Sequence, residues 1–108
     1  MARFVVTDPT ISNQAAAELP GAGRRLAAVI AQAAEPLAIL DAAANPQQVL
    51  DALVRLQRSQ ARIDRAKAEV LRQLSRAGAS TRGLGNELSL NRATVDRMIA
   101  AAEAEAQP

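Results

Sequence analysis

The chain has 108 residues, of which 49% are hydrophobic, and its formal net charge is only +2. A chain of this length supports one small core. With one Phe and no Tyr or Trp, that core must be built from Leu, Ile, Val and Ala. Ala supplies 26 residues and is the best helix former, so the composition predicts an all-α fold. The absence of Cys and His excludes disulfides and thiol catalysis and removes the commonest general base and metal ligand. We therefore expect no catalytic activity and no cofactor.

The first residues do not combine a basic start, an apolar run and a small-residue cleavage site. The longest apolar-rich stretch, residues 26–34, is much shorter than the ~20 residues that a membrane span needs. These patterns favour a soluble, cytoplasmic protein without a membrane partner.

Residues 1–20 show no clear packing pattern. Residues 4–6 (Phe-Val-Val) could form a short strand, but Asp8 and Pro9 would end it, and no second strand-like run is present to pair with it. A short helix over 12–19 is possible before Pro20-Gly21 breaks the chain. We expect a flexible or loosely docked arm here.

From residue 22 the pattern becomes helical. Leu26, Val29, Ile30 and Ala33 repeat at i, i+3, i+4 and i+7, which predicts one apolar helix face. Pro36 is expected to end this helix and to begin a second short one.

A long helix is predicted over residues 46–77. Asn45 is a strong N-cap, Pro46 suits the first helical position, and Gly78 is well placed as a C-cap. Between these limits there is no Gly or Pro. The helix carries a seam whose spacing alternates four and three, as in a coiled coil: Val49, Leu53, Leu56, Gln60, Ile63, Lys67, Val70, Leu74 and Ala77.

Two interpretations of this seam remain open. The long helix could pack on the chain's own short helices, with its polar middle in solvent. It could also form a two-helix dimer seam, in which Gln60 and Lys67 fix the register at a cost in stability.

Positive charge is concentrated between residues 55 and 82. Eight basic residues there face only two acidic ones, a local charge of +6, so the rest of the chain carries −4. Such an asymmetry is typical of proteins that contact nucleic acid, although a solvated helix face also explains a run of charge.

Residues 80–99 have the pattern of two short helices joined by a tight turn. Such a pair needs inward apolar residues, a very small residue at the closest approach, and capped helix starts. Gly85 supplies the small residue, Ser80 or Thr81 would cap the first helix, and Asn91 would cap the second. The expected apolar positions are Leu84 and Leu88 on the first helix, Leu90 in the turn, and Val95, Met98 and Ile99 on the second.

This segment resembles the helix-turn-helix of resolvase-type recombinases, phage repressors and small bacterial regulators. The shared pattern is small-or-Gly, turn, apolar, Ser/Asn, Arg, Ala, Thr, Val, and it covers less than a fifth of the chain. One position departs from it, because Ser89 stands where the turn usually has Gly. Ser adopts a positive φ less readily than Gly, so we expect a different or slightly longer turn.

The resemblance implies a sequence-specific protein that binds double-stranded DNA, expected to be a transcriptional regulator. Helix 92–104 would enter the major groove. One such motif buries too little surface for tight binding, so a homodimer reading two half-sites is expected. The division of the chain would be an arm (1–20), a helical region (21–79) and the helix-turn-helix (80–108).

The candidate DNA contacts follow from which residues face outward. On the second helix, Arg92 and Arg97 could read guanine and Asp96 could accept from cytosine. The full set of expected contacts is Thr81, Arg82, Asn86, Asn91, Arg92, Ala93, Asp96 and Arg97, with Arg72 and Arg76 from the basic helix before them.

Two other functions are compatible with the same residues. The protein could be a helical adaptor or subunit whose helix pair binds another protein. It could also be a DNA-packaging or recombination accessory factor, which binds DNA but regulates no gene.

Overall fold

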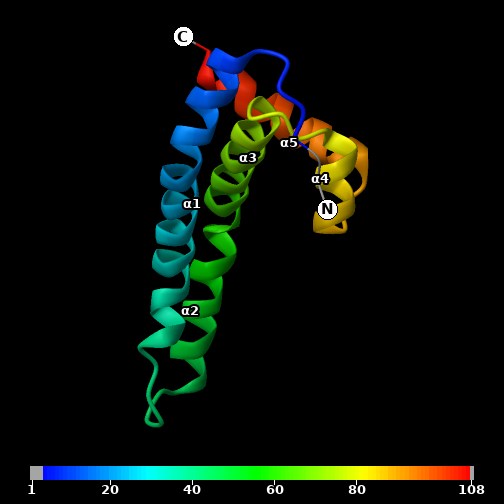
Figure 1. Ribbon diagram of the computed structural model, residues 1–108. Helices are drawn as coiled ribbons and strands as arrows, with labels where there is room; N and C mark the ends of the chain where they lie inside the picture. The colour runs from blue at the N-terminus through cyan, green and yellow to red at the C-terminus, as the bar shows by residue number, and fades with distance from the viewer. Residues whose placement is uncertain (1–3, 108) are drawn as a thin grey trace.

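The computed structural model describes residues 4–107, and within this range the chain is all-α, as its composition predicts. The helices are α1 (Pro9–Ala38), α2 (Pro46–Arg58), α3 (Gln60–Arg76), α4 (Thr81–Leu88) and α5 (Arg92–Ala106). α1 runs antiparallel to α2 and α3 and forms a long hairpin with them, and α4 and α5 lie near the end of the hairpin opposite its loop (Figure 1). None of these helices is both long and apolar enough to cross a membrane.

α1 is one continuous helix of 30 residues. The predicted break at Pro20-Gly21 and the predicted new start at Pro36 are therefore wrong. Each proline removes one backbone hydrogen bond from a helix, but α1 buries a row of small side chains along its whole length, and this tertiary packing outweighs the local preference. The buried residues are Ser12, Ala15, Ala22 and Ala33.

The beginning of the chain is attached to the loop between α3 and α4. The backbone N–H of Val5 donates to the carbonyl of Gly78 at 2.9 Å, and the Ser12 hydroxyl donates to the carbonyl of Ala77 at 3.0 Å. Gly78 has φ +118°, and a Cβ there would lie 2.6 Å from the Val5 carbonyl oxygen. Residues 9–20 of the expected arm are thus the first part of α1, and residues 1–3 of it lie outside the described range.

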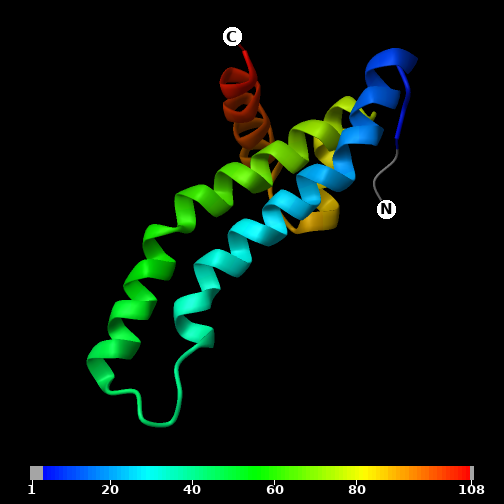
Figure 2. The same cartoon turned by 90° about the vertical axis from the view of Figure 1, so that its left-hand side faces the viewer.

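The predicted helix 46–77 is divided at Ser59, so the prediction of one uninterrupted helix is wrong. Asn45 caps α2 as expected, with its side chain accepting from the N–H of Gln48 at 2.9 Å. At Ser59 the hydroxyl donates to the carbonyl of Arg55 at 2.9 Å, a local hydrogen bond of the kind that bends helices. Figure 2 shows the resulting change of direction between α2 and α3.

The seam of α2 and α3 lies only partly against α1. Ala77 is buried, and the other apolar members in its second half are half-buried, whereas Val49 and Leu53 are 43% and 51% exposed. Packing within the chain therefore covers the seam only in part.

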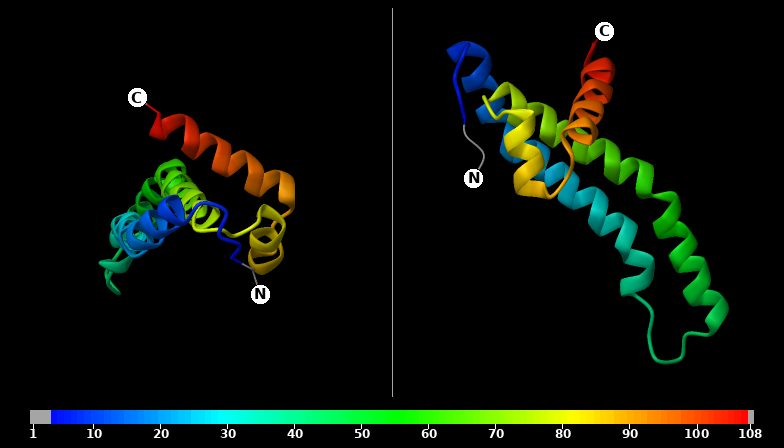
Figure 3. Two further views of the ribbon diagram at one scale, coloured as in Figure 1. Left: turned by 45° about the horizontal axis from the view of Figure 1, so that its top comes forward. Right: turned by 90° about the vertical axis from the view of Figure 1, so that its right-hand side faces the viewer.

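α3, α4 and α5 share one small core. It contains Leu71, Ala79, Leu84 and Val95, with Leu74, Met98 and Ile99 packed against it. This core joins residues on both sides of the expected domain boundary at 79/80. Figure 3 shows α3 lying between α1 and α5, so that α3 belongs both to the hairpin and to the C-terminal helices.

Candidate nucleic-acid interface

Both C-terminal helices begin with a side-chain cap. Ser80 is extended, and its hydroxyl accepts from the N–H of Gly83 at 3.0 Å, so Ser80 is the cap of α4 and Thr81 is its first helical residue. The side-chain Oδ1 of Asn91 accepts from the N–H of Thr94 at 2.8 Å and caps α5 as predicted. These caps define the residues at which α4 and α5 begin.

The turn between α4 and α5 contains three residues, 89–91. Ser89 has φ 57° and ψ 37°, the left-handed conformation that Gly usually supplies, so the expectation of a different or longer turn is wrong. The N–H of Leu90 donates to the carbonyl of Gly85 at 2.9 Å. A Cβ on Gly85 would lie 2.7 Å from the Leu90 carbonyl oxygen. The need for a very small residue is confirmed, and the closest neighbour is the backbone of the turn.

The inward positions of the pattern are only partly as predicted. Leu84 and Val95 are buried at 4% and 0% exposure. Leu88 and Leu90, expected to face inward and to fill the turn, are 49% and 38% exposed, so these two predictions are wrong. Both leucines instead line an open groove of about 800 Å³ between α3 and the turn.

Most of the expected DNA contacts lie on one connected part of the molecule, formed by α4, the turn and the first half of α5. Thr81 is half-buried. The other side chains of this set are exposed: Arg82, Asn86, Asn91, Arg92, Ala93, Asp96 and Arg97.

Two opposite charges on α5 face each other. The Arg92 Nε lies 3.7 Å from an Asp96 carboxylate oxygen, one turn along the helix, and the two side chains are 71% and 52% exposed. An exposed pair of this kind is weak, so Arg92 can exchange this carboxylate for another acceptor. Arg97 lies further along α5 and lines the groove between α3 and the turn.

Arg72 does not belong to this surface. Its guanidinium forms two hydrogen bonds to Glu69, at 3.0 and 3.1 Å, and its side chain is only 13% exposed. The hydrogen bonds that Arg72 donates to Glu69 raise the pKa of Arg72. The expectation that Arg72 contacts DNA therefore conflicts with its position, because the guanidinium is already paired with Glu69.

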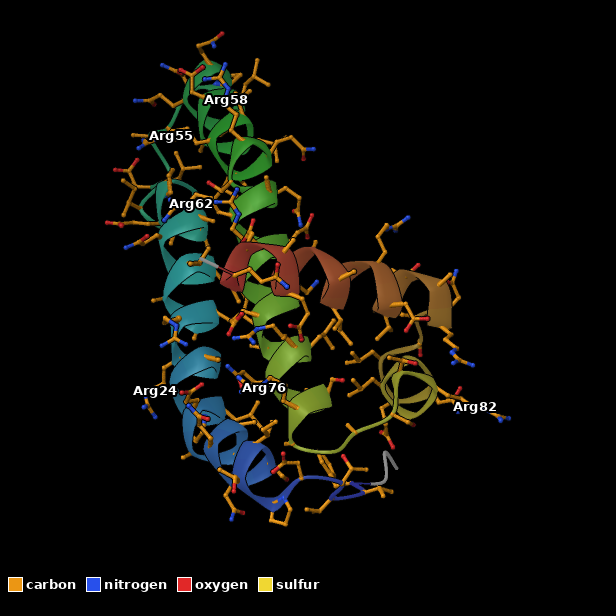
Figure 4. All side chains as sticks on the ribbon, turned by 90° about the horizontal axis from the view of Figure 1, so that it is seen from above. Arg24, Arg55, Arg58, Arg62, Arg76 and Arg82 are labelled. Carbon is orange, nitrogen blue, oxygen red and sulfur yellow. The ribbon has the colours of Figure 1, made fainter. Side chains whose placement is uncertain are left out.

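Arg76 is also separate from the expected contacts. Its side chain is half-buried, and Figure 4 shows it beside α3 and towards α1, whereas Arg82 projects from the far side of α4. The basic helix does not extend the surface of α4 and α5.

A polar network between α1 and α3 accounts for the position of Arg72, and sequence reasoning missed it. Gln73 is 2% exposed, and its amide donates to Glu18 at 3.0 Å and to Glu69 at 3.1 Å. Burial raises the pKa of the Glu69 carboxyl, but hydrogen bonds from Arg72 and Gln73 and the charges of Arg72 and Arg25 outweigh it, so the pKa lies below its ordinary value. A buried Gln on a helix otherwise rich in arginine gives no recognisable pattern in the sequence.

The other arginines of the basic run gather on the hairpin. Arg55, Arg58 and Arg62 lie near the bend between α2 and α3, far from Arg82 (Figure 4). Arg65 is paired with Glu105 of α5 at 3.1 Å. The run of charge is therefore spread over a different face of the molecule, as the interpretation of a solvated helix face predicts.

Among residues 4–107 no group of three or more acidic side chains is arranged to hold a metal ion. Comparison of the chain with models of protein families, with curated proteins and with solved structures finds no match.

Proposed function

We propose that this protein binds double-stranded DNA sequence-specifically as a transcriptional regulator, with the first half of α5 in the major groove. The observation that carries the proposal is the geometry of α4 and α5. Two short, capped helices are joined by a three-residue turn with a left-handed residue and rest on one core with α3. This geometry supports a helix-turn-helix, a motif whose second helix reads base edges near its N-terminus.

The exposed residues of this unit suit such a role. Arg82 lies in the first turn of α4, where a cation and the helix N-terminus together favour a phosphate. On α5, Arg92 and Arg97 are five residues apart, so they project roughly 140° from each other. Arg92 is nearer the N-terminus and is proposed to read a base, while Arg97 contacts a phosphate at the edge of the groove.

A single unit of this size buries too little surface for tight, specific binding. We therefore expect two copies of the chain to bind two half-sites of one DNA duplex. The spacing of the half-sites then follows from the distance between the two α5 helices.

The first test is selection of bound sequences from a random duplex pool, followed by mobility shifts over a range of salt concentrations. A binder of the proposed kind enriches a sequence with two related half-sites. Its affinity for that site falls steeply as salt rises, because bound counterions are released.

Three arginine variants then separate the proposed roles. Arg92→Ala should weaken binding to the selected site by about 1–3 kcal/mol and relax the preference at one base pair. Arg97→Ala should weaken binding to all sequences similarly and reduce the salt slope by about one. The matched control is Arg24→Ala, which removes an exposed arginine on α1. It should change neither the affinity for DNA nor the salt slope.

The same variants can refute the proposal. If Arg92→Ala and Arg97→Ala both fold normally and bind every duplex as the unmodified protein does, α5 does not bind DNA. A helix pair that binds another protein would then be the better explanation.

A further inference from the structure

The hairpin has one apolar side that the described part of the chain covers only in part. On α1, Ile30 is 44% exposed and lies four residues after Leu26, so both occupy the same side of the helix. On α2, Val49 and Leu53 are also four residues apart and are 43% and 51% exposed.

These residues lie on the same side of the hairpin as the groove between α3 and the turn. Leu26 of α1 and Val70 of α3 both line this groove, which fixes the side on which each lies. Val49 and Leu53 belong to the same four–three spacing that continues to Val70. We call this surface the apolar face: Leu26, Ile30, Val49, Leu53, Val70, Leu74, Leu88 and Leu90.

A second groove, of about 510 Å³, is lined by residues of α1, α3 and α5 and has a different chemistry. Its charged residues are Arg25, Arg62, Arg65, Glu69, Arg72 and Glu105, and its apolar residues are Val29 and four alanines. The large aliphatic side chains of the hairpin are therefore concentrated at the first groove, which contains Leu26, Val70, Leu71 and Leu74.

From these observations we infer that the apolar face binds the same face of a second copy of this chain, so that two hairpins form a four-helix bundle. This inference deepens the proposed function, because it names the surface that joins the two DNA-binding copies. It does not depend on DNA, since the face is a property of the hairpin.

One whole side of the hairpin is large enough for a dimer interface. α1 has 30 residues, so at about 1.5 Å per residue the hairpin is about 45 Å long, and two helices about 10 Å across present about 900 Å². A stable interface buries about 800 Å² on each partner.

The charges on the face favour a second copy over an unrelated partner. Asp64 and Lys67 both line the groove and lie about one helical turn apart on α3. In a two-fold symmetric dimer every contact occurs twice, so Lys67 of one copy can face Asp64 of the other.

The test is the molar mass in solution without DNA, measured by light scattering at tens of micromolar. The unmodified chain of 11.3 kDa should have about twice this mass. The double variant Ile30→Glu/Leu53→Glu should be a monomer, because two buried carboxylates per copy would oppose association. Both positions are about half exposed in the single chain, so helical circular dichroism should be retained.

The control is Ile39→Glu, which changes an aliphatic residue that is 72% exposed and follows the end of α1. This variant should remain a dimer. A monomeric unmodified protein, or a double variant that still dimerises, overturns the inference.

DNA binding separates this inference from the proposed function. If the unmodified chain is a monomer and still binds the selected duplex, the apolar face is not a dimer interface, and the proposed DNA binding is unaffected. A dimer that depends on the apolar face but binds no duplex supports the interface and refutes the proposed function.

Discussion

Replacing Gly85 by Ala provides a sharp test of the turn between α4 and α5, because Gly23 offers a matched control in α1. Ala is favoured over Gly in a helix by about 0.5–1 kcal/mol. A Cβ on Gly23 meets nothing within 4 Å. Gly23→Ala should therefore raise the free energy of unfolding by about 0.5–1 kcal/mol.

At Gly85 the same helix preference is opposed by a steric overlap. The new Cβ would lie 2.7 Å from the Leu90 carbonyl oxygen, a backbone atom that cannot rotate away. The turn is also held by the hydrogen bond from the Leu90 N–H to the Gly85 carbonyl. Overpacking of this kind costs about 1–3 kcal/mol, so Gly85→Ala should be destabilised by about 1–2 kcal/mol overall.

Urea unfolding followed by circular dichroism, at one protein concentration, measures both changes. The free energies of unfolding of the two variants should differ by about 1.5–3 kcal/mol, with opposite signs relative to the unmodified protein. If Gly85→Ala is stabilised as much as Gly23→Ala, the turn can move freely, and the close contact between Gly85 and Leu90 does not hold the two helices in place.

Three further predictions address other contacts. Asn91→Ala should lower the free energy of unfolding by about 1 kcal/mol, measured by urea unfolding, because the first turn of α5 loses its cap; an unchanged value would show that the cap contributes nothing. Ser12→Ala should cost about 1–3 kcal/mol by the same measurement, since the buried carbonyl of Ala77 loses its donor, and a neutral result would mean that the N-terminal segment is not held there. The pKa of Glu69 is below its ordinary value of 4.5, so its carboxylate contributes stability above about pH 4.5 that is lost as the pH falls through its lowered pKa. Melting temperatures measured between neutral and acidic pH should therefore fall less steeply for Glu69→Gln, and an unchanged acid dependence would contradict this role.

The sequence was sufficient where structure depends on a few neighbouring residues. The caps at Asn45 and Asn91 and the glycine at the turn are local features, since each involves contacts within about five residues. The all-α class follows in the same way from composition and helix preference.

Sequence reasoning failed where a residue depends on distant partners. Pro20 continues within α1 because the helix is packed along α3, which local preference does not reveal. Leu88 keeps the correct spacing for an inward residue but faces the groove, because α3 does not cover the end of α4. In the sequence Arg72 is one member of a basic run, and only the fold brings Gln73 and Glu18 close enough to complete its network with Glu69.

The position of α3 between two groups of helices has a consequence for the choice of DNA site. Gln73 on α3 contacts α1, and Leu71, two residues earlier, packs in the core with α5. No flexible linker therefore separates the hairpin from α5, and their relative rotation is fixed by one rigid helix. In the dimer proposed above, the two α5 helices would have a fixed separation and phase. Adding one base pair between half-sites rotates one of them by about 35° around the duplex, so a single inserted pair should abolish simultaneous contact by both copies.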